Sequence, residues 1–248
     1  MTTYSTSQIA KKVNLHSNTI RLYEALMLIP KADRKPNGYR VFTDVHLEQI
    51  KLARLALKGE VLQGGLRDKA LQIIKISATG DYSGAVKQTK DYLLSLKKEQ
   101  ENAEEAIEIT MRLIATKQPE TSPLRLSRKD AAEHLGVTID TLRNWELNGL
   151  ITVPRKENGY RTYTEKEIQV LKIIKTLRCA NYSLMSILRM LTAISASPLT
   201  NIRETIDLPD ESEDIISVCD TLLTSLKNTE QDARQMLKQL QSMKIKFK

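Results

Sequence analysis

Apolar residues recur three and four positions apart along most of the chain, which is the spacing that places them on one face of an α-helix. Stretches that alternate between apolar and polar residues, as strands do, are scarce. Glycine and proline are also few, with 9 and 7 among 248 residues. The pattern therefore predicts a mainly α protein, long enough for two small domains that each have a core.

The chain contains an internal repeat. Seven residues of the N-terminal half recur 122 positions later, and the tetrapeptide at 37–40 recurs at 158–161, which is 121 positions later. The one-residue difference falls in the segment before Asn158, where we expect a loop. Because deletions collect in loops, the repeat indicates two copies of one fold. The seven recurring pairs are Ser5 and Ser127, Ala10 and Ala132, Thr19 and Thr141, Arg21 and Arg143, Glu24 and Glu146, Leu28 and Leu150, and Ile29 and Ile151.

Each copy predicts a short helix, a turn and a second helix. The turn residue is Asn14 in the first copy and Gly136 in the second, and both residue types tolerate a left-handed backbone. The second helices, around 18–25 and 140–147, present polar side chains outward. Such a helix-turn-helix is typical of DNA-binding proteins. The outward residues are Asn18, Arg21, Asp140, Arg143 and Asn144.

An irregular stretch rich in cations follows in each copy and predicts a small hairpin wing. Its Asn-Gly pair is a hairpin-turn signal, and the flanking aromatic and β-branched residues favour strands. A third helix begins near Thr43 or Thr164, and Thr164 with Glu167 has the pattern of a capping box. The cations of the two wings are Lys31, Arg34, Lys35 and Arg40, then Arg155, Lys156 and Arg161.

These residues carry a resemblance to a known family. The strings TIRLYEALMLIP…NGYRVFT and TLRNWELNGLI…NGYRTYT resemble the N-terminal winged helix-turn-helix domain of the MerR family, and LRCANYSLMSI resembles the segment after its third helix. The second copy is the closer match. Two features depart from the family pattern: the first of two usual aromatic residues is Leu22 or Asn144, and the first copy loses the pattern after Leu57.

The resemblance implies a transcription regulator that binds a palindromic operator in a promoter with an overlong spacer, and then bends and untwists the DNA. It implies double-stranded DNA and, at the promoter, RNA polymerase as partners. Most members are homodimers joined by a long antiparallel coiled coil, and most carry an effector-binding segment after it. We expect the second copy to dominate affinity and the operator to be an imperfect palindrome.

The resemblance places DNA contacts on the second helix and the wing. We expect Arg21 and Arg143 on phosphates because they recur at matching positions. Tyr39 and Tyr160 suit a wing core as well as a DNA contact. Asp140 fits an acceptor for a cytosine amine or a helix cap, and we favour the cap. The full set of expected DNA-contacting residues is Ser17, Asn18, Thr19, Arg21, Tyr23, Arg34, Lys35, Tyr39, Arg40, Asp140, Thr141, Arg143, Asn144, Trp145, Arg155, Lys156, Tyr160 and Arg161.

A connector and a long helix follow each copy, with apolar residues in coiled-coil rhythm. We therefore divide the chain into a first module with connector (1–80), a long helix (81–117), a proline-bearing linker (118–124), a second module with connector (125–207) and a C-terminal helix (208–248) that Asp210 can cap. The predicted seam positions are Val86, Thr89, Leu93, Leu96, Gln100, Ala103, Ile107, Thr110 and Ile114 in the first helix, and Ile215, Cys219, Leu222, Leu226, Thr229, Ala233, Met236, Leu240 and Met243 in the second.

Such helices need a partner, because a solitary one would leave its apolar seam in water. The economical partner is the other long helix of the same chain, paired antiparallel, which predicts a single-chain pseudo-dimer. The seam from Val86 to Ile114 spans about 42 Å at ~1.5 Å per residue, comparable with the ~34 Å between major-groove half-sites. Two alternatives stay open: each helix packs on its own domain, or the helices pair between two chains and give a homodimer with four readers.

The composition favours a polyanionic partner. A net charge of +8 and a pI of about 9.3 suit either nucleic acid or an anionic membrane surface. No apolar segment has the length of a signal peptide or a membrane helix, so we expect a cytoplasmic protein without a membrane partner. We also expect Cys179 and Cys219 to be free thiols that are buried in apolar surroundings. Tyr23 and Trp145 are expected to pack the domain and also to reach the DNA backbone.

No enzyme is expected, because no nucleophile with a base, phosphate loop or paired acid organises a site. The cysteines and histidines lack metal-ligand spacing, so neither a metal nor another cofactor is expected. Two other functions stay open. One is a sensor for a drug or metabolite of unknown identity, bound between the halves near the connectors 58–80 and 193–207; the other is an architectural DNA-bending protein.

Overall fold

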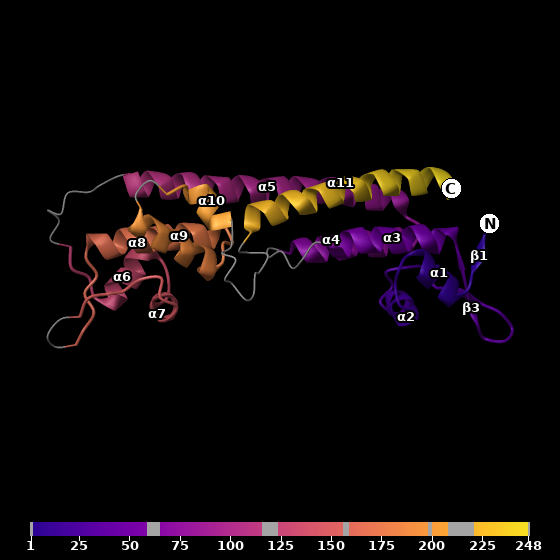
Figure 1. The fold of residues 1–248 in the computed structure, drawn as a ribbon, viewed down its shortest axis with the longest axis horizontal. Coiled ribbons are helices and arrows are strands. Elements are labelled where there is room, and N and C mark those ends of the chain that lie inside the picture. Colours follow the sequence, from indigo (N-terminus) through magenta and orange to yellow (C-terminus); the bar gives the residue numbers. More distant parts are fainter. Residues whose placement is uncertain are drawn as a thin grey trace. The chain divides into compact units, whose positions relative to one another are not determined.

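The computed structural model describes residues 2–58, 65–115, 124–155, 159–197, 200–207 and 221–247. The described chain is mainly helical with one small antiparallel sheet, which confirms the predicted fold class (Figure 1). It divides into two compact units, Met1–Lys98 with Ser225–Lys248 (unit 1) and Glu99–Thr224 (unit 2). Each unit holds one copy of the repeat.

Module 1, residues 2–58, is a winged helix-turn-helix in unit 1. Its sheet has the order β1-β3-β2, and Tyr4 pairs with Phe42 while Arg34 pairs with Arg40. Buried apolar side chains of the three helices and of the sheet form its core around Ile9 and Ile20. Its elements are β1 (Thr3–Tyr4), α1 (Thr6–Lys12), α2 (Ser17–Ala25), β2 (Asp33–Arg34), β3 (Arg40–Thr43) and α3 (Asp44–Lys58).

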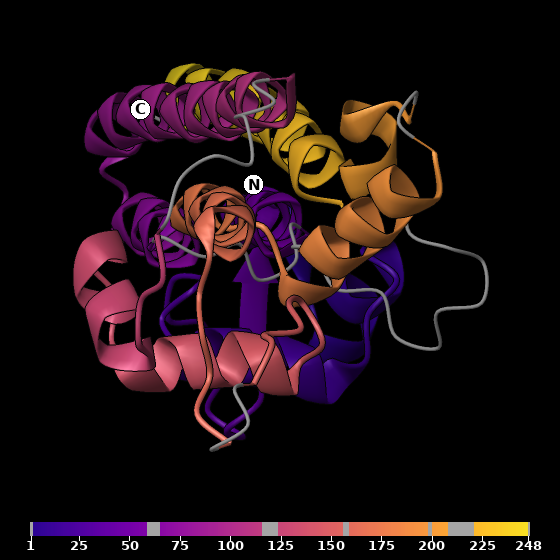
Figure 2. The same cartoon turned by 90° about the vertical axis from the view of Figure 1, so that its left-hand side faces the viewer.

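Module 2, residues 124–179, repeats this arrangement in unit 2 and is coloured from rose to orange in Figure 2. Isolated bridges join Leu126 to Tyr163 and Arg155 to Arg161, the same register as in module 1. The residue missing from the second copy therefore lies between Ile151 and Arg155, before the wing. The helices of module 2 are α6 (Arg128–Leu135), α7 (Ile139–Leu147) and α8 (Glu165–Cys179).

Local signals shape both helix-turn-helix motifs. Ser5 and Ser127 each form a capping box at the start of the first helix. The turn residues Asn14 and Gly136 have φ of 51° and 63°, the left-handed backbone that the sequence predicts. The capping pattern at the third helix is also present, since the Glu167 carboxylate accepts from the Thr164 backbone N–H at 2.8 Å.

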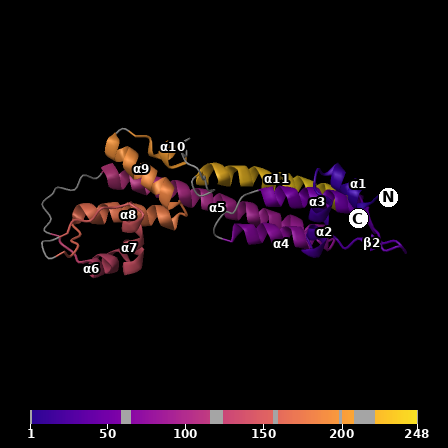
Figure 3. The same cartoon turned by 60° about the horizontal axis from the view of Figure 1, so that its bottom comes forward.

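Two further helices complete unit 1 around module 1, namely α4 (Leu66–Ala78) and α11 (Leu222–Lys246), together with the first part of α5 (Tyr82–Ala115). Helices α3 and α4 lie side by side (Figure 3). A buried side chain, Gln49, joins them, because its amide donates to the Leu28 and Ile74 carbonyls at 3.0 and 2.9 Å.

Helix α11 follows module 2 in the sequence but packs in unit 1. Its Gln239 amide donates to the Glu48 carbonyl at 2.8 Å, and its buried Asp232 pairs with Lys58 at 3.3 Å. The ring of Phe247 lies 6.5 Å from that of Tyr82, so the end of α11 lies beside the start of α5. The alternative in which each long helix packs on its own domain is therefore wrong for α11.

The predicted seams are mostly buried. All seven described seam residues of α11, from Leu222 to Met243, are buried. In α5, five of the predicted positions are buried and the other four are half-buried, while Tyr82 and Tyr92 are buried although no seam position was assigned to them. The predicted cap Asp210 and the linker at 118–123 lie outside the described residues, as do Ile215 and Cys219.

Unit 2 contains the second part of α5 and two helices after module 2, α9 (Leu184–Ala196) and α10 (Ile202–Asp207). Tyr182, fully buried, donates from its hydroxyl to the Ala103 carbonyl of α5 at 3.4 Å. Burial raises the pKa of this hydroxyl. Cys179, predicted to be buried, is exposed at the end of α8.

Candidate DNA interface

The second helix of each module, α2 or α7, has one buried face and one exposed polar face. Ile20 in α2 and Leu142 in α7 point into the module cores. The opposite face is exposed, and in α2 the Arg21 guanidinium donates to the Asn18 side-chain oxygen at 3.3 Å. The exposed residues include Asn18, Arg21, Asp140, Arg143 and Asn144, the five that the sequence placed outward.

Each of these helices begins at a cap that was not predicted from the sequence. In α2, His16 accepts from the Asn18 backbone N–H through Nδ1 at 3.2 Å. In α7, the Thr138 hydroxyl accepts from the Thr141 backbone N–H at 3.0 Å. The interpretation of Asp140 as the cap is therefore wrong, because Asp140 lies within the first turn and not before it.

An ion pair joins the second helix to the wing in each module. Glu24 accepts from Arg40 Nε at 2.5 Å, and Glu146 accepts from Arg161 Nε at 2.6 Å. Both arginines are half-buried and hold the wing to the helix. Their expected contact with DNA stays a prediction. The recurrence of Glu24 and Glu146 together with the two arginines was the available signal for this pair.

Glu24 stays charged in this position. Burial by itself would raise the pKa of its carboxyl, but the Ala32 backbone N–H at 3.0 Å and the Arg40 guanidinium outweigh burial and lower it. In module 2, Arg128 donates a second charged hydrogen bond to Glu146 at 2.6 Å. The acid is thus the centre of the wing–helix connection in both modules.

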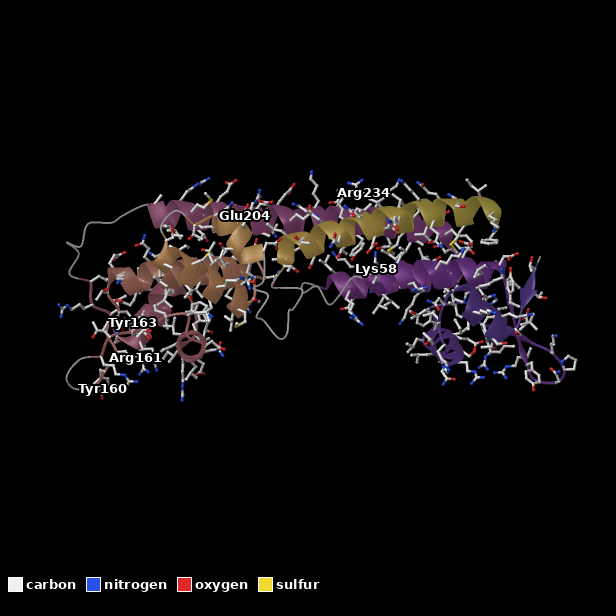
Figure 4. The ribbon with its side chains drawn as sticks, viewed as in Figure 1. Lys58, Tyr160, Arg161, Tyr163, Glu204 and Arg234 are labelled. Carbon is white, nitrogen blue, oxygen red and sulfur yellow. The ribbon has the colours of Figure 1, made fainter. Side chains whose placement is uncertain are left out.

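The wings present cations and one tyrosine each. Tyr39 is 72% exposed and Tyr160 is 74% exposed, so the interpretation of these residues as wing core is wrong. Tyr160 lies at the end of the wing, whereas Tyr163 lies inside the module (Figure 4). The described wing cations Arg34, Lys35 and Arg155 are exposed, and Lys156 lies outside the described residues.

The remaining expected contact residues are less accessible. Trp145 is buried and packs the domain, while Tyr23 is half-buried, and burial raises the pKa of its hydroxyl. Ser17, Thr19 and Thr141 are half-buried at the edge of the exposed face.

The two modules differ in net charge. Residues 2–58 carry ten lysines and arginines and four acidic residues, for a net charge of +6. Residues 124–179 carry eleven lysines and arginines and seven acidic residues, for a net charge of +4.

Among the described residues, no group of histidine, cysteine and acidic side chains is arranged to hold a metal ion. A separate search of the same residues finds no helix long and apolar enough to cross a membrane.

Comparison with known proteins gives two family matches, one in each unit. Residues 126–194 match a model described as "MerR HTH family regulatory protein", and residues 5–42 match one described as "MerR family regulatory protein". Both segments cover the helix-turn-helix described above. No solved structure matches the chain significantly.

Curated relatives match over part of their length. The HTH-type transcriptional regulator CueR of Salmonella typhi is 41% identical over 56 residues, which is 22% of this chain and 41% of the relative. The HTH-type transcriptional regulator AdhR of Bacillus subtilis is 34% identical over 86 residues, covering 34% and 61%. The HTH-type transcriptional repressor CarH of Myxococcus xanthus is 44% identical over 48 residues, covering 19% and 16%. The chain thus spans about two fifths of the CueR relative.

Proposed function

We propose that this chain, which matches MerR-family models in both halves, is a DNA-binding transcription regulator whose two modules occupy the two halves of one operator. The observation that carries the proposal is the duplicated exposed surface: a second helix with an outward arginine, next to a wing with exposed cations and tyrosine. Each second helix would enter a major groove, and each wing would lie on flanking phosphates.

The proposal extends to the promoter. By analogy with the family, the bound regulator bends and untwists a promoter with an overlong spacer. This distortion changes whether RNA polymerase can recognise the promoter. In each module the wing is held to the second helix, α2 or α7, by Glu24 or Glu146. This suits the task, because a rigid module can transmit strain to the DNA that it binds.

We also propose that one chain forms a single-chain pseudo-dimer, in which its two modules take the places of the two subunits of a dimer. The long helix after each module braces the other module's third helix. In unit 1, Gln239 of α11 donates to the Glu48 carbonyl of α3; in unit 2, Gln169 of α8, which is equivalent to Glu48, donates to the Leu113 carbonyl of α5 at 2.5 Å. This reciprocal exchange supports a single-chain pseudo-dimer.

Two measurements test the function and the assembly together. The purified chain should enrich a specific sequence from a pool of random duplex DNA. Its affinity for that sequence should fall steeply as the salt concentration rises. Light scattering of the free protein and of the complex should give one 28.1 kDa chain per duplex. Failure to enrich any sequence would contradict DNA reading, while a stable particle of twice that mass would support pairing between two chains.

A second candidate, control by a small molecule, is favoured by a pocket inside unit 2. The pocket measures about 380 Å³, within the range of ligand sites. Val170 lines it at the position equivalent to the buried Gln49, whose amide joins α3 and α4 in module 1. The apolar lining residues are Ile114, Leu150, Ile151, Val170, Ile173, Leu191 and Ile194.

This pocket suits a small, mostly apolar ligand, and it is formed within unit 2. The end of α5 and the residues directly after the recognition helix both line it, so a ligand there would bias the position of module 2. Val170→Gln copies the residue that fills the equivalent space in module 1. We expect this variant to lose fluorescence enhancement of the dye anilinonaphthalene sulfonate. An unchanged signal, with the variant folded, would contradict a site here.

A further inference from the structure

The two recognition helices, α2 and α7, differ in charge at one pair of equivalent positions. The second residue is Asn18 in α2 and Asp140 in α7, and they are 122 positions apart, as are Arg21 and Arg143. Both second residues are exposed. In helix-turn-helix proteins, the N-terminal residues of the recognition helix contact base edges. This pair is therefore a place where the two modules can read different bases.

Asp140 is not needed to build module 2. Thr138 caps α7, and the Asp140 carboxylate makes neither a hydrogen bond nor an ion pair with any other described residue. Arg143, one turn further along the same face, is exposed as well. The remaining structural role is a favourable interaction with the helix dipole in the first turn. This role predicts an effect on folding and none on base preference.

A carboxylate on a DNA-facing helix restricts what can lie opposite it. It only accepts hydrogen bonds, and phosphates repel it. In the major groove, the cytosine N4 amine offers a donor, whereas guanine presents acceptors at N7 and O6. The side-chain amide of asparagine instead matches adenine, which has a donor at N6 beside an acceptor at N7. The acid thus selects by repulsion as well as by attraction.

We infer that Asp140 and Asn18 are base-reading residues that make the two half-sites different: Asp140 takes a cytosine at the position where Asn18 takes an adenine. The inference rests on the proposed function, since it requires both modules on one operator. It gives the imperfect symmetry of that operator a definite place and a definite base, in contrast to a general divergence between the halves.

Selection from random duplex DNA, run in parallel on the wild type and on Asp140→Asn, tests the inference. The wild type should enrich an operator with A·T in one half-site and C·G at the matching position of the other. With Asp140→Asn, the selection should enrich A·T in place of C·G at this position, and the consensus at the other positions should stay the same. On the wild-type operator, this variant should lose about 5- to 150-fold in discrimination at that pair. Asn18→Asp should produce the reverse change in the other half-site.

Glu133→Gln is the matched control. Glu133 is exposed on α6 of the same module, and its side chain makes no hydrogen bond with the described residues. Its variant removes the same charge, so it should raise affinity for every sequence alike without changing the consensus. Circular dichroism melts of all variants check that folding is unaffected.

The possible failures are distinct. A symmetric wild-type consensus, or an Asp140→Asn consensus identical to that of the wild type, would overturn the assignment of the two bases while leaving DNA binding intact. A wild type that enriches no sequence would contradict the proposed function itself, and the inference with it.

Discussion

Glu24 accepts a hydrogen bond from Arg40 Nε at 2.5 Å and thereby ties the recognition helix of module 1 to its wing. The same connection joins Glu146 and Arg161 at 2.6 Å in module 2. All four side chains are at least partly buried, with the acids at 11% and 18% exposure. The pair therefore fixes the position of each wing relative to its second helix.

Breaking this pair should loosen the wing and destabilise the module. Glu24→Gln removes the charge but keeps the shape, and we expect a loss of about 1–2 kcal/mol in the free energy of unfolding, because hydrogen bonds to charged groups are among the stronger ones. Urea unfolding measures it. Glu133→Gln, which removes an exposed acid, should change stability little. Equal effects of the two variants would show that the ion pair contributes nothing specific.

The lowered pKa of Glu24 makes the same contribution dependent on pH. The folded state binds its proton less readily than the unfolded state, so the stabilisation is present above the unfolded pKa and is lost as the pH falls through the folded pKa. Unfolding measured between pH 6 and pH 3 should therefore show a steeper loss of stability for the wild type than for Glu24→Gln. If stability falls equally steeply with pH in the wild type and in Glu24→Gln, the pKa of Glu24 is not lowered by folding.

His46 adds a second pH effect in module 1. It takes the place of Glu167, and its Nδ1 accepts from the Thr43 backbone N–H at 3.0 Å. Burial lowers the pKa of His46 from its ordinary value of 6.5. Because the unfolded state then binds the proton more readily, stability should fall as the pH drops below about 6.5 and towards the folded pKa.

His46→Glu, which copies module 2, should remove that loss between pH 7 and pH 5.5. Urea midpoints measured across this window provide the test. A wild-type midpoint that stays constant over the window would contradict the prediction.

Met27 occupies a backbone position that favours glycine. It follows α2 with φ of 57°, and the equivalent residue of module 2 is Gly149, with φ of 75°. Because Met27 is 66% exposed, its side chain contributes little packing. We expect Met27→Gly to stabilise the protein by about 0.5–1 kcal/mol through relief of the left-handed strain. Gly149→Ala should destabilise it by a similar amount, although nothing lies within 4 Å of the added carbon. An unfolding midpoint for Met27→Gly below that of the wild type would contradict this prediction.

Arg21 and Arg143 should contact phosphates and not bases. Each is exposed at the same position of its helix. Arg143→Ala should weaken binding to all sequences and lower the slope of log affinity against log salt by about one. Fluorescence anisotropy at several salt concentrations measures the slope. If the slope is unchanged and sequence preference is lost, Arg143 reads a base.

The relative strength of the two modules stays a prediction. The closer family match of the second copy favours module 2, whereas the net charge of +6 against +4 favours module 1 in the part of affinity that salt screens. Comparing Arg21→Ala with Arg143→Ala at low and high salt separates the two terms. A larger loss for Arg143→Ala than for Arg21→Ala at high salt would show that module 2 contributes more of the affinity, and a larger loss for Arg21→Ala would contradict its dominance.

The sequence by itself determined what depends on a few neighbouring residues. The repeat, the two helix-turn-helix motifs, the capping box at Thr164 and the left-handed turns at Asn14 and Gly136 all follow from short-range patterns. The seam of α11 was equally readable, because helical spacing alone shows which residues share a face. Backbone geometry and side-chain periodicity are local properties, so they are present in the sequence before any packing.

Only the tertiary structure decided which groups meet across the chain. It brought Arg40 to Glu24 across 16 positions, and it placed α11 in unit 1 although it follows module 2. It also left Cys179 exposed, where residue type suggested a core, and it left Tyr39 exposed, where the sequence suited a wing core as well as a DNA contact. Such outcomes depend on contacts between distant segments and on the space left among them, and no short window of sequence contains that information.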